Sequence, residues 1–178
     1  MIDFDNYKVR PLEKEDLLPY FNMVERNRKR LEDFFTGTVT KTKNLPATIS
    51  FLEEILAKRE LKQYYPFIII EKTSKNFIGF IDLKNLDWSI PKTEIGCYTD
   101  RDFAGKGLTT KIINQFVNYC FDQYHFVKIF LRTHHSNKAA QQIAKNCGFE
   151  LEGNIRMDYK TTSGEIVDLL YFGKLNNK

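Results

Sequence analysis

The spacing of apolar residues changes several times along this chain of 178 residues, and each change marks a predicted element. Apolar positions three and four residues apart predict amphipathic helices, whereas short runs of β-branched and aromatic residues predict strands. Segment 13–32 carries Leu17, Phe21 and Val24 at helical spacing, but Pro19 interrupts it, so two shorter helices are the alternative. Helices are also expected over 47–62, 108–121 and 138–146, strands over 7–10, 66–70, 77–83, 93–99, 127–133, 151–161 and 166–175, and a loop over the polar segment 36–44.

The order of these elements predicts the fold class. The strands 66–70, 77–83 and 93–99 follow one another with short connections, as in an antiparallel meander. The last two strands flank a Thr-Ser-Gly turn at 162–164, which is typical of a hairpin. We therefore expect a single α+β domain over 1–178, with a mixed, mostly antiparallel central sheet and helices on both of its faces.

Composition and charge narrow the classes of protein further. The chain is 42% hydrophobic and 14% aromatic, as expected for a globular protein. No apolar run approaches the roughly 20 residues of a membrane helix, and the acidic start 1–6 lacks a signal-peptide pattern. We expect a cytoplasmic protein that does not bind membranes.

The formal net charge of +4 is small for 27 basic and 23 acidic residues. The densest basic cluster, 26–30, is part of a predicted helix and is interpreted as a solvated helix face; a patch that attracts an acidic partner is the alternative. Nucleic-acid binding is not expected, because such proteins usually concentrate their positive charge.

The three cysteines, Cys97, Cys120 and Cys147, are widely separated and have no metal-ligand spacing. We therefore expect neither a disulfide framework nor a metal site. Cys120 and Cys147 lie on apolar helix faces and are interpreted as packing residues. Cys97 lies on the predicted strand 93–99, where a nucleophilic role is the alternative to packing.

The segment 101–110, Arg-Asp-Phe-Ala-Gly-Lys-Gly-Leu-Thr-Thr, carries the first chemical signal. It follows a predicted strand and opens a helix, and Gly105 and Gly107 let the backbone approach a ligand closely. The first amides of a helix lack internal partners and favour an anion. The segment therefore predicts a phosphate-binding loop, with a simple chain turn as the alternative.

A second segment, 137–149, follows the strand 127–133. Together the two segments resemble the GNAT superfamily of acyl-CoA-dependent N-acetyltransferases, and within it the RimJ/RimL type that acetylates N-termini of ribosomal proteins. The matching residues are Val24–Arg28 with Leu31, Glu94–Gly96, Gly105–Gly107, Asn137 to Gly148-Phe149, and Glu152-Gly153.

The resemblance implies an acyl-CoA N-acyltransferase fold, in which the strands 93–99 and 127–133 splay apart and acetyl-CoA lies between them. It also implies transfer of an acetyl group to a primary amine, with the N-terminal α-amine of a protein, such as a ribosomal protein, as the expected acceptor. A small-molecule amine (a polyamine or an aminoglycoside) and a catalytically silent acyl-CoA-binding protein are the alternatives. A homodimer is a further implication.

The resemblance also implies the residues that contact acetyl-CoA. The backbone of the second half of strand 93–99 would pair with the pantetheine arm, and the loop amides would hold the pyrophosphate. Asn137 would contact the arm, cap the following helix, or do both. Ala104 and Thr109 depart from the residues that the superfamily prefers, and the Thr109 and Thr110 hydroxyls have helix capping as an alternative role. The implied contacts are Cys97, Tyr98, Thr99, Ala104, Gly105, Lys106, Gly107, Leu108, Thr109, Thr110 and Asn137.

The resemblance implies Glu94 as general base, acting through water; a solvent-facing strand residue is the alternative. Roughly 10–15% of a free α-amine but only ~0.04% of a lysine amine is neutral at pH 7, so a relayed carboxylate suits an N-terminal amine better. The usual Tyr and Ser positions of the general acid hold Ala144 and Ala140. Nearby candidates for the acid are His134, His135, Ser136 and, less directly, Tyr98; departure of the thiolate without an acid is the alternative.

Overall fold

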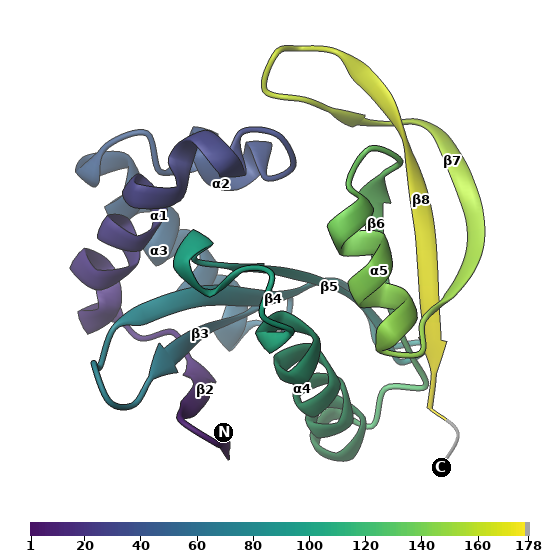
Figure 1. Cartoon of the computed structure of the whole chain (residues 1–178), viewed down its shortest axis with the longest axis horizontal. Coiled ribbons are helices and arrows are strands. Elements are labelled where there is room, and N and C mark those ends of the chain that lie inside the picture. Colours follow the sequence, from purple (N-terminus) through teal and green to yellow (C-terminus); the bar gives the residue numbers. More distant parts are fainter. Residues whose placement is uncertain (177–178) are drawn as a thin grey trace.

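One sheet of eight strands forms the centre of the chain, and the computed structural model describes residues 1–176 (Figure 1). The strand order is β1-β2-β3-β4-β5-β6-β8-β7, and every neighbouring pair is antiparallel except β5 and β6, which are parallel. This confirms the predicted mixed, mostly antiparallel sheet. The strands are β1 Ile2–Phe4, β2 Tyr7–Pro11, β3 Tyr65–Glu71, β4 Phe77–Asp87, β5 Lys92–Thr99, β6 Lys128–His134, β7 Glu150–Lys160 and β8 Ile166–Leu175.

Helices cover both faces of the sheet, as predicted (Figure 1). On one face α4 buries its apolar stripe, including Ile112, Phe116 and Cys120, against the sheet, and α5 contributes Ala144 to the same core. On the other face α1 and α3 pack around Tyr20. The helices are α1 Leu17–Leu31, α2 Thr36–Lys41, α3 Leu45–Glu60, α4 Leu108–Tyr124 and α5 Lys138–Asn146, with 3-10 turns η1 Lys14–Asp16 and η2 Arg101–Phe103.

One local prediction is wrong, one strand was not predicted, and one open alternative is excluded. The segment 36–44 is not entirely a loop, because α2 forms there around buried Val39, and Arg28 donates hydrogen bonds to the carbonyls of Val39 and Thr42. Tertiary packing thus stabilises a helix that the threonine-rich sequence does not announce. The acidic start contains the short strand β1, which pairs with β2. The helix predicted over 13–32 is one α-helix, α1, preceded by η1, and Pro19 lies in its first turn.

The two parallel strands separate as predicted. β5 and β6 pair only where Lys92–Glu94 faces Lys128–Phe130. Beyond that point β5 remains paired with β4 as far as Thr99, and β6 remains paired with β8 as far as His134. A V-shaped gap therefore opens in the middle of the sheet, between two strands that are each held by their outer neighbour.

In the described range 1–176, we find no helix with the length and apolar character needed to cross a lipid bilayer.

Candidate active site

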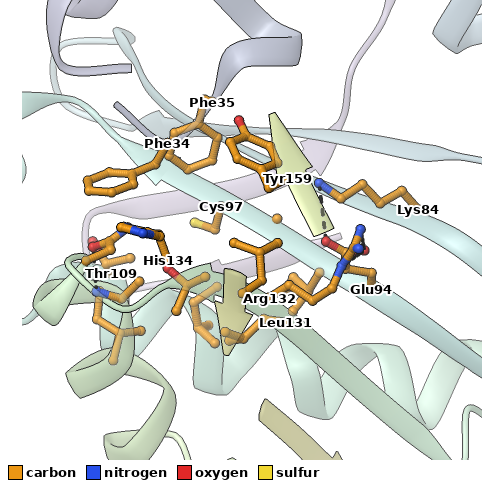
Figure 2. Close-up of a pocket in the computed structure, with 18 residues that line it drawn as sticks. Phe34, Phe35, Lys84, Glu94, Cys97, Thr109, Leu131, Arg132, His134 and Tyr159 are labelled. Atoms are coloured by element: carbon orange, nitrogen blue, oxygen red, sulfur yellow. Dashed lines mark hydrogen bonds and ion pairs between the residues drawn. The ribbon is translucent and has the colours of Figure 1, made fainter. Parts of the chain in front are cut away.

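A cavity of about 180 Å³ lies in the gap between β5 and β6. Its roof comes from two segments that are far apart in the sequence: Phe34 and Phe35 between α1 and α2, and Tyr159 on β7. Figure 2 shows these three rings over Cys97 of β5. Because Tyr159 also accepts a hydrogen bond from the backbone amide of Thr36 at 2.8 Å, the two halves of the roof are directly joined.

The two ends of the cavity differ in chemistry. Thr109 of α4 and His134 of β6 lie at one end, and Lys84 of β4 and Glu94 of β5 lie at the other (Figure 2). The first end adjoins the glycine loop and the start of α4. The second lies where β5 and β6 converge, and it collects charged side chains.

The inner edge of β5 offers backbone groups to this cavity. The amide of Asp100 donates to the carbonyl of Ile78 on β4 at 2.6 Å. Since hydrogen bonding alternates along an antiparallel pair, this register turns the backbone groups of Tyr98 toward β4 and those of Cys97 and Thr99 toward the gap. The carbonyl of Thr99 already accepts a hydrogen bond from Arg30, so its amide is the group that remains available.

Tyr98, expected to contribute backbone contacts and named as a possible acid, points its side chain away from the cavity. Its ring is buried in the core beneath α1, where its hydroxyl donates to that of Tyr20 at 3.3 Å. Burial, together with the neighbouring Tyr20, raises the pKa of Tyr98 well above its ordinary value. The side chain therefore cannot act as the general acid in the cavity.

The glycine loop has backbone angles that favour glycine, which are compatible with the predicted anion site and with a simple turn. Gly105 and Gly107 have φ angles of 74° and 73°, in the left-handed region that favours glycine, and a Cβ built at either position meets no described atom within 4 Å. Gly107 is the N-cap of α4, and as a glycine it has no side chain that could accept hydrogen bonds from the first helix amides. Its carbonyl accepts the first hydrogen bond of the helix, from the amide of Lys111. The amides at the start of α4 are thus open to a ligand.

Two loop residues are engaged within the protein. The amide of Ala104 donates to the carbonyl of Arg101 at 3.1 Å, so the part of the loop with open amides begins after Ala104. The ammonium of Lys106 donates to the carbonyl of Asp102 at 2.8 Å and turns back along the loop. The expected contribution of Ala104 through its amide is therefore corrected.

The remaining residues implied as cofactor contacts differ in their burial and in their hydrogen bonds. Leu108 is buried in the core, so it can offer only its amide, and Thr110 is half-buried. The hydroxyl of Thr109 lies 3.0 Å from that of Thr99 and ties α4 to β5. Asn137 caps α5, since its Oδ1 accepts from the amide of Ala140 at 3.1 Å, and it also lines the cavity.

Glu94 is buried at the convergent end of the cavity, not solvent-facing. Its Oε2 accepts three hydrogen bonds, at 3.1 and 2.8 Å from Arg132 and at 2.7 Å from Asn85. Asn85 lies in a bulge of β4 and has a φ of 50°, a conformation that asparagine tolerates better than most residues. The other oxygen, Oε1, accepts no hydrogen bond from the described residues and lies 3.6 Å from the ammonium of Lys84.

The two cations at this end are held differently. Arg132 bridges two carboxylates, since it binds Glu94 and also donates to Asp158 on β7 at 2.6 Å. Lys84 lies 3.6 Å from Glu94 and 4.0 Å from Asp82, which are ion-pair distances and not hydrogen bonds. The nearby charge of Asp82 is the main cause that raises the pKa of Lys84, with burial acting in the opposite direction.

His134 is the one acid candidate that lines the cavity, and its Nδ1 lies 2.7 Å from the hydroxyl of Ser136. Ser136 is exposed and reaches the cavity only through His134. His135 is exposed, yet its ring centroid lies 4.1 Å from that of His134. Of the two rings only that of His134 lines the cavity, and β6 ends at His134, so strand alternation does not extend to His135.

The two alanines at the usual acid positions also differ. Ala140 lines the cavity, whereas Ala144 is fully buried in the core between α4 and α5. Cys97 lines the cavity, but burial raises the pKa of its thiol, so the thiol remains protonated at neutral pH and is a poor nucleophile. Cys120 and Cys147 are buried, as expected of packing residues.

Sequence reasoning missed most of the convergent end. Lys84 and Arg132 are charged residues next to apolar runs in β4 and β6, which was the available signal, but both strands carry other charged residues as well. No local pattern indicates that Phe34, Phe35 and Tyr159 meet over the cavity, because the contact depends on the hairpin of β7 and β8.

The chain is similar to known acetyltransferases along most of its length. A family model described as “Acetyltransferase (GNAT) domain” matches residues 7–150. The protein named “Putative ribosomal N-acetyltransferase YdaF” from Bacillus subtilis is 25% identical over 179 residues, which cover 98% of this chain and 93% of that protein. Spermidine N(1)-acetyltransferase from Vibrio cholerae is 24% identical over 147 residues and covers 83% of this chain and 80% of the relative.

Solved structures show the same fold. Ribosomal-protein-S5-alanine acetyltransferase from Vibrio fischeri superposes with a TM-score of 0.88 at 18% identity and covers 99% of this chain and 97% of its own. RimL, the ribosomal L7/L12 α-N-protein acetyltransferase solved with coenzyme A, also has a TM-score of 0.88, at 13% identity, with 96% and 94% covered. The splayed strands, the glycine loop and the matched family model lead to one conclusion: this chain is an acyltransferase that belongs to the GNAT family of N-acetyltransferases.

Proposed function

We propose that this chain transfers the acetyl group of acetyl-CoA to the N-terminal α-amine of a protein. The observation that carries the proposal is the cavity between β5 and β6, which extends from Thr109 at the start of α4, past the open backbone edge of β5, to the buried carboxylate of Glu94. Relatives named for ribosomal proteins support a protein acceptor.

The residues present fit acetyl-CoA. The inward-facing backbone groups of Cys97 and the amide of Thr99 suit the amides of a pantetheine arm, which can pair with β5 as a missing strand does. The loop amides after Ala104 and the start of α4 suit a pyrophosphate. When bound, acetyl-CoA supplies an already activated thioester, so the protein has to orient the amine and manage its protons.

Glu94 is proposed as the proton acceptor. Its Oε2 is fixed by Arg132 and Asn85, whereas its Oε1 accepts no hydrogen bond from any residue in the range 1–176. Oε1 can therefore receive the proton of the attacking amine, directly or through one water. Arg132 and Asn85 act as positioning residues that hold the carboxylate at the point where β5 and β6 converge.

His134 is proposed to stand near the departing sulfur, at the opposite end from Lys84. If the hydroxyl of Ser136 donates to Nδ1 of His134, the proton of the neutral ring lies on Nε2, where it can donate a hydrogen bond to a departing thiolate. Complete proton transfer would need the imidazolium, which donates from Nδ1 to the Ser136 oxygen and becomes a neutral ring when its Nε2 proton leaves. Ser136 is then a positioning residue. Thiols with a pKa near 8.5 are fair leaving groups, so this donation is expected to contribute modestly.

A small-molecule amine is the second candidate acceptor, because relatives named spermidine N(1)-acetyltransferase match 83% and 85% of the chain. The test measures release of free thiol from acetyl-CoA with three kinds of acceptor: peptides with free N-termini, spermidine and an aminoglycoside. Faster release with peptides supports the proposal, and faster release with spermidine supports the second candidate.

Calorimetric titration with coenzyme A accompanies the thiol assay. Binding of coenzyme A without amine-dependent thiol release would identify a silent acyl-CoA-binding protein and would overturn the proposed function. Peptides whose α-amine is blocked are the matched control, because they keep the lysine amines and remove only the proposed acceptor.

A further inference from the structure

The ammonium of Lys84 is the least engaged charge at the convergent end of the cavity. It donates no hydrogen bond to any residue in the described part of the chain, and its nearest acidic oxygen, Oε1 of Glu94, is 3.6 Å away. Its side chain is 37% exposed, and the residue lines the cavity. Lys84 therefore presents N–H donors to whatever occupies this end.

The neighbouring charges are already committed to one another. Arg132 is shared between Glu94 and Asp158. Asp82 accepts a hydrogen bond from the hydroxyl of Tyr64. The side chains of Glu94 and Asp82 are only 6% and 14% exposed, so the anions lie deeper than the cation. An acceptor that enters from the cavity thus meets the ammonium of Lys84 before it meets Asp82.

Lys84 keeps its charge at neutral pH. The charge of Asp82 raises its pKa above the ordinary value, despite the opposing effect of burial. The residue is therefore a fixed cation and not a proton acceptor. A fixed ammonium with free donors attracts a carboxylate and repels a second ammonium.

We propose that Lys84 determines acceptor specificity by binding a carboxylate that lies close to the reacting amine. This inference rests on the proposed amine acetylation and narrows its substrate class. The expected substrates are α-amines next to an acidic group, such as N-termini with Asp or Glu in the second position. Polycations such as spermidine are disfavoured, because their second ammonium would approach Lys84.

The test compares two short peptides that differ only in charge, one beginning Ser-Glu and the other Ser-Gln. The wild-type chain is expected to acetylate the Ser-Glu peptide with a kcat/KM about tenfold higher, as for a close, partly desolvated charge pair. The preference is expected to shrink as salt is added, because salt screens the pair. Free glutamate and spermidine complete the panel, and faster reaction of free glutamate would show that the carboxylate comes from an amino acid and not from a peptide side chain.

Variants assign the preference to Lys84. In Lys84→Met the ratio of the two kcat/KM values is expected to fall to about one, whereas Lys84→Arg is expected to retain most of it. Lys14→Met is the matched control: Lys14 is exposed on η1, so its replacement changes the net charge equally and is expected to leave the ratio unchanged. Circular dichroism verifies that each variant is folded, and if the Met variant is not, the wild-type ratio and its dependence on salt still test the inference.

Three results would overturn the inference. These are a wild-type ratio near one, a ratio that persists in Lys84→Met, and faster acetylation of spermidine than of the Ser-Glu peptide. Acetylation of all peptides regardless of the second residue refutes the role of Lys84 but leaves the proposed function intact. Absence of thiol release with every amine refutes the proposed function, and the role of Lys84 with it.

Discussion

Replacing Gly107 by alanine tests whether the loop around it binds phosphate or is a simple turn. At a φ of 73° an alanine costs roughly 1–2 kcal/mol more than glycine. No described atom lies within 4 Å of the added Cβ, so this backbone strain is the whole cost within the free protein. If free and bound loops shared one conformation, the strain would cancel and the affinity for coenzyme A would not change.

We expect the affinity to change, for two reasons. The exposed loop can relax to a less strained conformation in the free protein, and binding must then restore the left-handed one. The space that the Cβ enters is also the space through which the pyrophosphate would approach the loop amides. Restoring 1–2 kcal/mol of strain corresponds to about a 5–30-fold weaker affinity, and any contact with the ligand adds to it.

Gly164 provides the matched control. It lies in the hairpin turn between β7 and β8 with a φ of 91°, and a Cβ there also meets no described atom within 4 Å. Gly164→Ala is expected to lower the free energy of unfolding by a similar amount without weakening coenzyme A binding. Urea unfolding and calorimetric titration measure the two quantities. Undiminished stability of Gly107→Ala would show that its free loop has relaxed, and coenzyme A affinity equal to wild type in that case would refute the phosphate-binding role.

Three further predictions concern side chains. Glu94→Gln is expected to lower kcat by about 10²-fold or more with little change in coenzyme A affinity, and normal turnover at pH 7 would exclude a proton-accepting role. His134→Ala and Ala140→Ser are each expected to change kcat by less than about tenfold; a hundredfold loss in His134→Ala with intact binding would instead identify an essential acid. Burial raises the pKa of Asp100, but hydrogen bonds, above all from Arg26, lower it more, so its net pKa lies below the ordinary 3.8. Its contribution to stability is therefore present above about pH 4 and lost as the pH falls through the lower folded pKa. Unfolding curves of Asp100→Asn are expected to lack this part of the acid dependence, and an unchanged profile would contradict the assignment.

The sequence was informative wherever one local pattern determines the structure. The apolar stripe of α4 is buried as its periodicity predicts, and glycines 105 and 107 have the positive φ angles that their loop requires. It was less informative where tertiary contacts decide. The helix α2 depends on Arg28 and on burial of Val39, and neither is visible in the threonine-rich segment. Asn85 reaches Glu94 from a bulge that shifts the register of β4, which no periodicity announces.

The two ends of the cavity differ in how well the sequence predicts them, because they are built from different kinds of groups. The end proposed for the cofactor is built mainly from backbone groups, and a sequence encodes a backbone site through glycines and helix starts that are local and recognisable. The end proposed for the acceptor is built from side chains on β4, β5, β6 and β7 and on the segment between α1 and α2, which meet only after the sheet and the β7–β8 hairpin have formed.

The roof of the cavity shows how these segments are held together. Besides the bond from the Thr36 amide to Tyr159, the hydroxyl of Thr162 donates to the carbonyl of Glu32 at 2.7 Å and lies 3.0 Å from the hydroxyl of Thr36. Hydrogen bonds of this kind contribute about 0.5–1.5 kcal/mol each, and the hydroxyl pair is exposed to competing water. The core under α4 is far more costly to disturb, since each buried apolar side chain there contributes about 1.5–3 kcal/mol. If the proposed acceptor end is correct, exchanges in the roof and at Lys84 would therefore change its choice of amine while the backbone that would hold acetyl-CoA stays fixed.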